Sequence, residues 1–213
     1  FVNILIYWIV LNLTNNVLVF EPLFQEVEIF NYFMFFCSIV FILGFVDDRR
    51  NLKPNFKFLI LSSLILILLL FDKDLNLNHL RFSFNQSGFF LGKFSIFFSI
   101  FCFLVFMNAF NMFDGINLQS SSYALFIFFN FLIFFSDSLI IKILIITLIF
   151  FIYLNLKNRS FLGDSGSLLL AFIISYFFVK FYNISYIKYA DNVALYMIVP
   201  GLDLIRLFIL RIL

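Results

Sequence analysis

Long apolar runs, broken at intervals by short polar stretches, dominate this chain. A helix needs about 20 apolar residues to cross the hydrocarbon core of a bilayer, because it rises about 1.5 Å per residue. Runs near that length recur along the sequence and predict about eight membrane-spanning helices. The expected spans are 1–13, 29–46, 56–71, 89–107, 119–135, 138–154, 167–182 and 193–210. The pattern therefore predicts an all-α fold, a polytopic integral membrane helix bundle.

Composition excludes a water-soluble globular protein. Hydrophobic residues make up 64% of the 213 residues and charged residues 12%, against roughly 45–50% and roughly 25% in ordinary soluble domains. The net charge of +2 offers no basic surface for nucleic acid, so we expect no nucleic-acid partner. Cys37 and Cys102 lie inside apolar runs and are expected to be inert packing residues. Without a repeat or a linker, residues 1–213 form a single expected domain.

Alternating the spans across the membrane places the loops around 47–57, 108–118 and 155–166, and the segment after Pro200, on one side. Eight of the 14 basic residues fall on that side: Arg49, Arg50, Lys53, Lys57, Lys157, Arg159, Arg206 and Arg211. The positive-inside rule predicts that this side faces the cytoplasm. In one connector on the other side, residues 80–84 alternate apolar and polar positions and favour a short hairpin strand.

Three motifs that combine Asp with a neighbouring Gly fall on the predicted cytoplasmic side, each at the end of a span. They are GFVDDRR (44–50), NAFNMFDGIN (108–117) and FLGDSGS (161–167). An acid at the bilayer centre costs roughly 2.5–3.5 kcal/mol on insertion scales, so acids gather at membrane depth only where something compensates. A solvated helix end explains any one motif. Three motifs on one face favour a polar site.

The second motif places amide and carboxylate groups at a helix end. Asn108 and Asn111 share a helix face, and their amides would be left in lipid unless a ligand or another helix meets them. We expect Gly115 to end this helix, which frees Asp114 and Asn117 to point into a loop.

The other two motifs offer groups for a phosphate and its metal ion. Free N–H groups at the start of the span predicted from Ser167, beside Asp164, suit a phosphate with a metal ion. Lys57 is either a phosphate ligand or part of the positive-inside charge. Asp47 and Asp48 point about 100° apart on a helix, so one can face the site while the other orients or neutralises a basic partner.

The ordered set GFVDDRR, NAFNMFDGIN, FLGDSGSLLLAF and PGLDLIR (200–206) resembles the polyprenyl-phosphate N-acetylhexosamine-1-phosphate transferase family. The similarity is greatest to its UDP-GlcNAc:undecaprenyl-phosphate GlcNAc-1-phosphate transferase branch, which is related to phospho-MurNAc-pentapeptide transferase. The resemblance implies transfer of a sugar 1-phosphate from a UDP-sugar to polyprenyl (undecaprenyl) phosphate, with release of UMP. Mg²⁺ is the implied cofactor, with Mn²⁺ as a substitute.

The resemblance also implies residue roles and a location. Asp164 is expected to bind the metal ion, and Asp47 and Asp48 to form the catalytic pair. Substrate binding is expected from Asn108, Asn111, Asp114, Asn117, Lys57 and Arg206. The family often has Asp where Asn117 stands. The implied location is the bacterial cytoplasmic (inner) membrane, with the active site on the cytoplasmic face, at the first membrane step of cell-envelope glycan synthesis such as that of O-antigen.

The resemblance calls for elements on both sides of this sequence, including a histidine-rich loop after Arg206. We therefore expect the sequence to be an interior piece of a longer protein. The sole histidine, His79, is expected to be a solvated residue of an outer connector. A homodimer is compatible with the resemblance. The alternative from another class is a secondary transporter that uses membrane-embedded acids as a cation relay, but the acids near mid-membrane and the inverted repeat that it predicts are not found.

Overall fold

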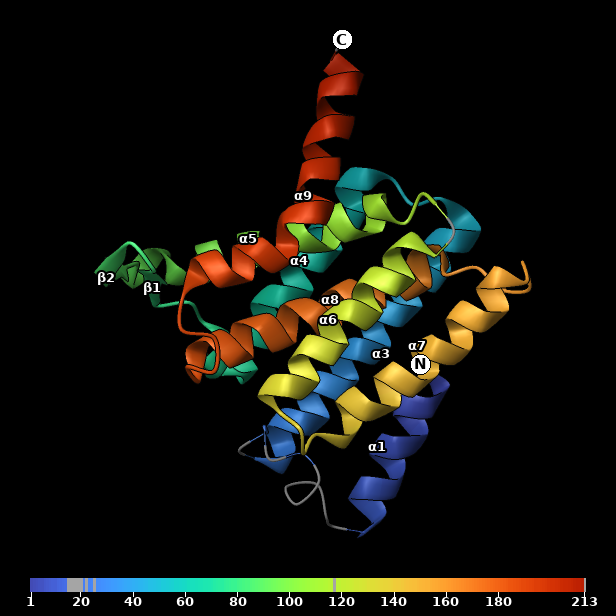
Figure 1. The fold of residues 1–213 in the computed structure, drawn as a ribbon, viewed down its shortest axis with the longest axis horizontal. Helices are drawn as coiled ribbons and strands as arrows, with labels where there is room; N and C mark the ends of the chain where they lie inside the picture. Colours follow the sequence, from blue (N-terminus) through green and yellow to red (C-terminus); the bar gives the residue numbers. More distant parts are fainter. Residues whose placement is uncertain (15–20, 22, 25, 117, 213) are drawn as a thin grey trace.

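The computed structural model describes the chain except for residues 15–20, 22, 25, 117 and 213 and the side chains of 85–87, 211 and 212. The described helices form an all-α membrane bundle, with one small hairpin at its side (Figure 1). The elements are α1 (Val2–Thr14), α3 (Val27–Arg50), α4 (Pro54–Phe71), η1 (Lys73–Leu75), β1 (His79–Phe82), β2 (Asn85–Phe90), η2 (Gly92–Phe94), α5 (Ser95–Phe113), α6 (Gln119–Phe134), α7 (Leu139–Leu156), α8 (Gly163–Asn183) and α9 (Ala190–Ile212).

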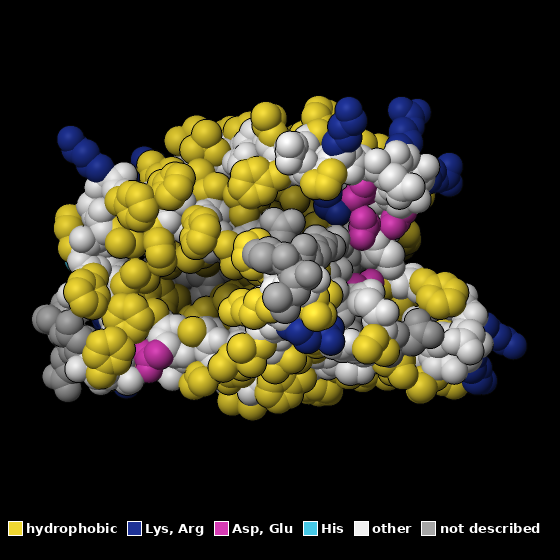
Figure 2. All heavy atoms as spheres, turned by 90° about the horizontal axis from the view of Figure 1, so that it is seen from above, with side chains coloured by type: hydrophobic (Ala, Val, Ile, Leu, Met, Phe, Trp, Pro, Cys, Tyr) yellow, Lys and Arg dark blue, Asp and Glu magenta, His cyan; other side chains and the backbone are white. Residues whose placement is uncertain are grey.

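Six helical segments of the described part are long and apolar enough to cross a membrane. They are α3, α4, η2 with α5, α7, α8 and most of α9, while α1 and α6 are shorter apolar helices. Many large hydrophobic side chains lie on the outside of the bundle, as expected of helices that face lipid (Figure 2). The predicted polytopic helical fold is confirmed.

Helix α8 lies at the centre of the bundle, between α3, α5 and α6 (Figure 1). Every residue from Ser167 to Tyr182 is buried, which is the behaviour expected of a helix that is apolar on all sides. Aromatic rings fill the contact with α3, where the ring centres of Phe33 and Tyr176 lie 4.5 Å apart. Any functional group at an end of α8 is therefore held by a rigid central element.

The structure corrects the bounds of the predicted span 89–107. Residues up to Phe90 belong to β2, which pairs antiparallel with β1 through His79 opposite Phe90 and Leu80 opposite Phe89. Hydropathy does not distinguish an apolar strand from the start of an apolar helix. The predicted span therefore joined the end of β2 to α5. The helix itself is α5, which begins at Ser95 and continues to Phe113. The expected hairpin strand near 80–84 is confirmed in β1, which ends at Phe82, and His79 is exposed there as predicted.

Two helices extend further toward the predicted cytoplasmic side than the sequence indicated. Helix α3 continues through Arg50, past the predicted end at 46, and stops where Asn51 adopts a left-handed conformation with φ of 47°. Arg49 and Arg50 in its last turn complement the helix dipole. Helix α8 begins at Gly163 instead of Ser167. The end of the first motif and most of the third motif therefore lie inside regular helices.

The chain alternates between the two ends of the bundle, so the turns after α3, α5 and α7 meet at one end. At the opposite end, Lys180 of α8 is fully buried. Its Nζ lies 3.1 Å from Asp72 and 3.0 Å from Asp74, and the Tyr176 hydroxyl donates a 2.6 Å hydrogen bond to Asp72. Helix α9 contains Pro200, and its C-terminal part projects beyond the bundle (Figure 1, red).

Candidate functional site

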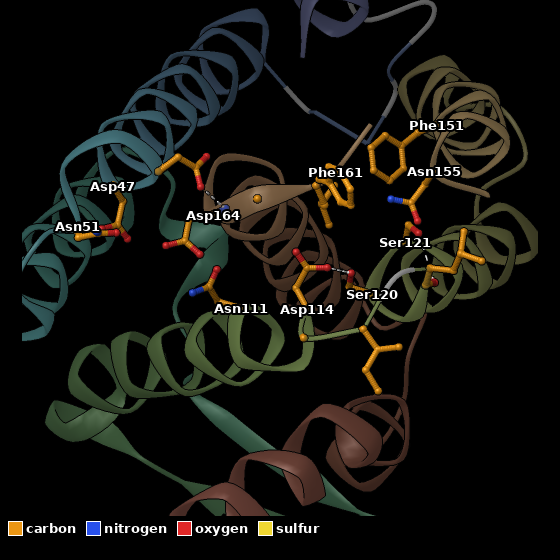
Figure 3. Close-up of a pocket in the computed structure, with 16 residues that line it drawn as sticks. Asp47, Asn51, Asn111, Asp114, Ser120, Ser121, Phe151, Asn155, Phe161 and Asp164 are labelled. Atoms are coloured by element: carbon orange, nitrogen blue, oxygen red, sulfur yellow. Dashed lines mark hydrogen bonds between the residues drawn. The ribbon is translucent and has the colours of Figure 1, made fainter. Parts of the chain in front are cut away.

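The three Asp-containing motifs meet around a cleft of about 340 Å³ at one end of the bundle (Figure 3). Its lining comes from the ends of α3, α5 and α7, the starts of α6 and α8, and the loop between α5 and α6. Seen from above, most of the visible acidic side chains gather on one side of the molecule with lysine and arginine side chains nearby, while most of the remaining face is hydrophobic (Figure 2). The cleft is thus a polar site at the end of an apolar bundle.

Lys57 joins two of the motifs by ion pairs. Its Nζ lies 2.5 Å from Asp47 Oδ2 and 3.2 Å from Asp164 Oδ2. Asp47 is in the last turn of α3 and also accepts the Leu52 N–H at 2.8 Å, so the tight turn into α4 places Lys57 beside it. The Asp47 side chain is 6% exposed, whereas that of Asp164 is 38% exposed. Part of the Asp164 side chain is therefore exposed to the cleft.

Asp48 points to the first turn of α8. Its two carboxylate oxygens accept the backbone N–H groups of Asp164 at 2.7 Å and Ser165 at 3.1 Å. The sequence predicts free N–H groups beside Asp164, at the start of a span that begins at Ser167. The structure corrects this point, because the motif forms the first turn of the helix and a carboxylate already occupies two of its N–H groups.

Asp114 follows the last residue of α5 and accepts a hydrogen bond from the Ser120 hydroxyl. Burial raises the pKa of Asp114 to about 6, and the negative charges of Asp164 and Asp48 act in the same direction. A cation bound in the cleft would stabilise the ionised form of this carboxyl group. Helix α5 ends at Phe113, just before the Gly115 expected to end it.

The remaining predicted residues divide between the cleft and its surroundings. Asn111 lines the cleft and accepts a hydrogen bond from the Ser167 hydroxyl of α8. Asn108 donates to the carbonyl of Leu104 in its own helix at 2.8 Å and is not part of the lining. Asn117 lies outside the described residues. Arg206 pairs with Asp203 at 2.7 Å in a neighbouring cleft of about 580 Å³, which shares Gly115 and Ile116 with the first.

Several residues that line the cleft are not predicted from the sequence. Asn155, at the end of α7, is 4% exposed and donates to the carbonyl of Ser160 at 2.6 Å. Its Oδ1 is buried and has no hydrogen-bond partner among the described residues, so it can accept a hydrogen bond from a ligand. Phe151 and Phe161 lie near it, across the cleft from Asp47 (Figure 3). The only signal in the sequence was a polar residue at the end of an apolar run.

The donor chemistry of the cleft fits Mg²⁺ held together with a phosphate. Within the described part of the chain, no group of three or more His, Cys, Asp or Glu side chains is arranged to hold a metal ion by itself. Mg²⁺ is, however, usually bound through one or two carboxylates plus substrate phosphates. Four carboxylates line this cleft, and Lys57 pairs with two of them. Oxygen donors and an excess of negative charge are what a hard divalent cation requires.

Fold and site together define a multi-pass membrane protein with a carboxylate-lined cleft at one end of its bundle. The chain belongs to glycosyl transferase family 4, whose family model matches residues 30–182. This match includes the three motifs and the central helix α8 except for its last residue, Asn183. It confirms the resemblance to polyprenyl-phosphate hexosamine-1-phosphate transferases.

Curated relatives agree with the family match. The chain is 28% identical over 148 residues to undecaprenyl-phosphate alpha-N-acetylglucosaminyl 1-phosphate transferases of Escherichia coli strain K12, Escherichia coli O6:H1 and Shigella flexneri. Each match covers 64% of this chain and 40% of the relative. The matched region therefore covers less than half the length of each of these relatives. None of these comparisons supports the transporter alternative.

Proposed function

We propose that the protein transfers N-acetylhexosamine 1-phosphate from a UDP-sugar to polyprenyl phosphate, with release of UMP. The observation that carries the proposal is the convergence of Asp47, Asp114 and Asp164 on one cleft, within the segment matched by the family. The relatives are named for undecaprenyl phosphate and N-acetylglucosamine, which supports undecaprenyl phosphate and UDP-GlcNAc as the substrates. The reaction would then be a first membrane step of cell-envelope glycan synthesis, such as that of O-antigen.

Phosphoryl transfer requires mainly positioning and neutralisation of charge. A phosphate monoester has its second pKa at about 6, so the lipid phosphate is largely dianionic at pH 7 and attacks the β-phosphorus of the UDP-sugar directly. UMP leaves as the new pyrophosphate bond forms. The ammonium group of Lys57, held by Asp47, supplies fixed positive charge beside the reacting phosphates. Asp114 and Asn111 line the part of the cleft that would hold the nucleotide.

Asp164 is the residue best placed to hold Mg²⁺ or Mn²⁺, because its carboxylate is partly open to the cleft. When bound there, the ion would neutralise charge on the pyrophosphate oxygens. The adjoining cleft that contains Arg206 provides a further cation near the substrates. Asn108 and Asn117 remain proposed substrate-binding residues on the strength of the family resemblance alone.

Turnover by the purified full-length protein tests the function. We expect UMP release from UDP-GlcNAc only when undecaprenyl phosphate and Mg²⁺ are both present, together with formation of a lipid-linked sugar pyrophosphate. A matched reaction without lipid controls for hydrolysis of the nucleotide sugar. Release of UMP without a lipid product, or an intact UDP-sugar under all these conditions, would contradict the proposal.

We place the cleft on the cytoplasmic face of a bacterial cytoplasmic membrane. Arg49 and Arg50 at the end of α3 support this orientation, since positive charge concentrates in cytoplasmic loops. Single cysteines in the segment 157–160, introduced into a background without Cys37 and Cys102, should escape an impermeant reagent added from outside intact cells. Labelling of that segment would reverse the orientation.

The raised pKa of Asp114 predicts that divalent-cation binding weakens in acid. Below about pH 6 this carboxyl group is mostly protonated, so the cleft loses one negative charge and a bound cation loses its attraction. We expect Mn²⁺ binding to the full-length protein to fall by several-fold, up to about tenfold, between pH 7 and pH 5. Asp114→Asn should bind more weakly at pH 7 and show a flatter profile near pH 6. An unchanged profile in this variant would show that another group controls the pH dependence.

A further inference from the structure

Helix α8 begins without a cap of its own. The first N–H groups of a helix have no partner within it, and a polar side chain just before the helix normally accepts one of them. Here the residue before the helix is Leu162, whose side chain has no acceptor. Asp48, from a helix more than 100 residues earlier, accepts the N–H groups of Asp164 and Ser165 in its place. A single side chain therefore provides the missing cap.

Two glycines make this contact sterically possible. Gly44 lies one turn before Asp48 on α3, and a Cβ there would be 2.5 Å from the Cα of Ser165 and 2.6 Å from the carbonyl oxygen of Asp164. Gly163 has φ of +64°, and a Cβ there would be 3.0 Å from both oxygens of Asp48. The first and third motifs thus form one close joint between α3 and α8.

The joint acts on the residue that is proposed to hold the metal ion. Both hydrogen bonds from α8 to Asp48 come from the peptide groups on either side of the Asp164 Cα, so they fix its backbone. The Asp164 side chain is then free to reach Lys57 and the cleft. Asp47 faces Lys57, so the two adjacent acids have different tasks. Helix α7 is capped in a comparable way at the opposite end of the bundle, where buried Glu21 accepts the Ile140 N–H at 2.6 Å.

We propose that Asp48 is a positioning residue, which caps α8 and holds Asp164 in place, and is not a catalytic residue. Both of its oxygens accept N–H groups from α8, so its carboxylate is held against the start of that helix. The same contact occupies the helix N-terminus that the sequence alone predicts as a phosphate site. This inference rests on the proposed role of Asp164 as the metal ligand.

Hydrogen exchange in the full-length, metal-free protein tests the cap without any need for activity. We expect exchange in the segment 163–167 to be about tenfold faster in Asp48→Ala than in the wild type, because the cap is lost. Asp48→Asn retains one carbonyl acceptor at the same place, so its exchange should stay closer to that of the wild type. Unchanged exchange in Asp48→Ala would overturn the proposal, because α8 would then not depend on Asp48.

Transferase assays of the same variants separate positioning from catalysis. Asp48→Asn should retain most of the wild-type kcat, whereas Asp47→Asn, the matched neighbour, should lose it. Asp48→Ala should need several-fold more Mg²⁺ for half-maximal rate. Equal and complete loss of activity in Asp48→Asn and Asp48→Ala, with normal exchange in Asp48→Asn, would overturn the proposal and make the charge of Asp48 catalytic. If the wild-type protein proves inactive, the proposed function fails, while hydrogen exchange still decides whether Asp48 caps α8.

Discussion

Replacing Asp164 by asparagine is expected to lower kcat/KM for sugar-phosphate transfer by at least about a thousandfold, because a metal ligand worth several kcal/mol in the transition state is lost. Asparagine has almost the same size and keeps the backbone N–H that donates to Asp48, so the first turn of α8 should remain in place. What changes is one negative charge that faces both the cleft and Lys57. The effect should therefore appear in catalysis and not in folding.

The measurement is UMP release by the full-length variant over a wide range of Mg²⁺ and lipid concentrations. Extra lipid should not rescue the variant, because the missing charge serves the metal ion and not the acceptor. Asp137→Asn is a matched control, since Asp137 is exposed in the turn between α6 and α7, at the other end of the bundle. Near-normal turnover of Asp164→Asn at every Mg²⁺ concentration would remove Asp164 from the proposed metal site.

The part of the site that is formed by helix ends could be predicted from the sequence. Hydropathy locates the spans because lipid excludes charge, and alternation of the spans then brings the ends of α3, α5 and α7 to one side. Asp47, Asp114 and Asp164 stand out there as acids beside apolar runs. Their convergence on one cleft follows from the order of the spans, with little need for details of packing.

Contacts between distant segments were not predictable in the same way. Nothing near Leu162 in the sequence shows that Asp48 supplies the cap of α8. The hydropathy pattern therefore predicts a start at Ser167, four residues after the observed start at Gly163. Pairing of β2 with β1 likewise depends on a partner strand and not on local hydropathy. The buried Lys180 was counted within a span end, and only the structure reveals the acid partners that compensate its charge.

The close joint between α3 and α8 leads to a second large expected effect. Gly44→Ala adds a methyl group that would lie 2.5 Å from the Ser165 Cα and 2.8 Å from its nitrogen, well inside van der Waals contact. The atoms in the way are backbone atoms of the buried central helix, which have no rotamer to change, so the two helices must separate. Overpacking of this kind typically costs about 1–3 kcal/mol.

Separation of α3 from α8 would disturb both the cap by Asp48 and the pairing of Lys57 with Asp47 and Asp164. We therefore expect Gly44→Ala to lower transferase activity by about a hundredfold or more, because even small misplacement of catalytic groups is costly. Thermal stability, followed by gel filtration of heated detergent-solubilised protein, should fall as well. Gly201→Ala is the matched control, since a Cβ at Gly201 in α9 would meet no atom within 4 Å. Wild-type activity and stability in Gly44→Ala would mean that α3 and α8 do not approach each other as closely as the cap by Asp48 requires.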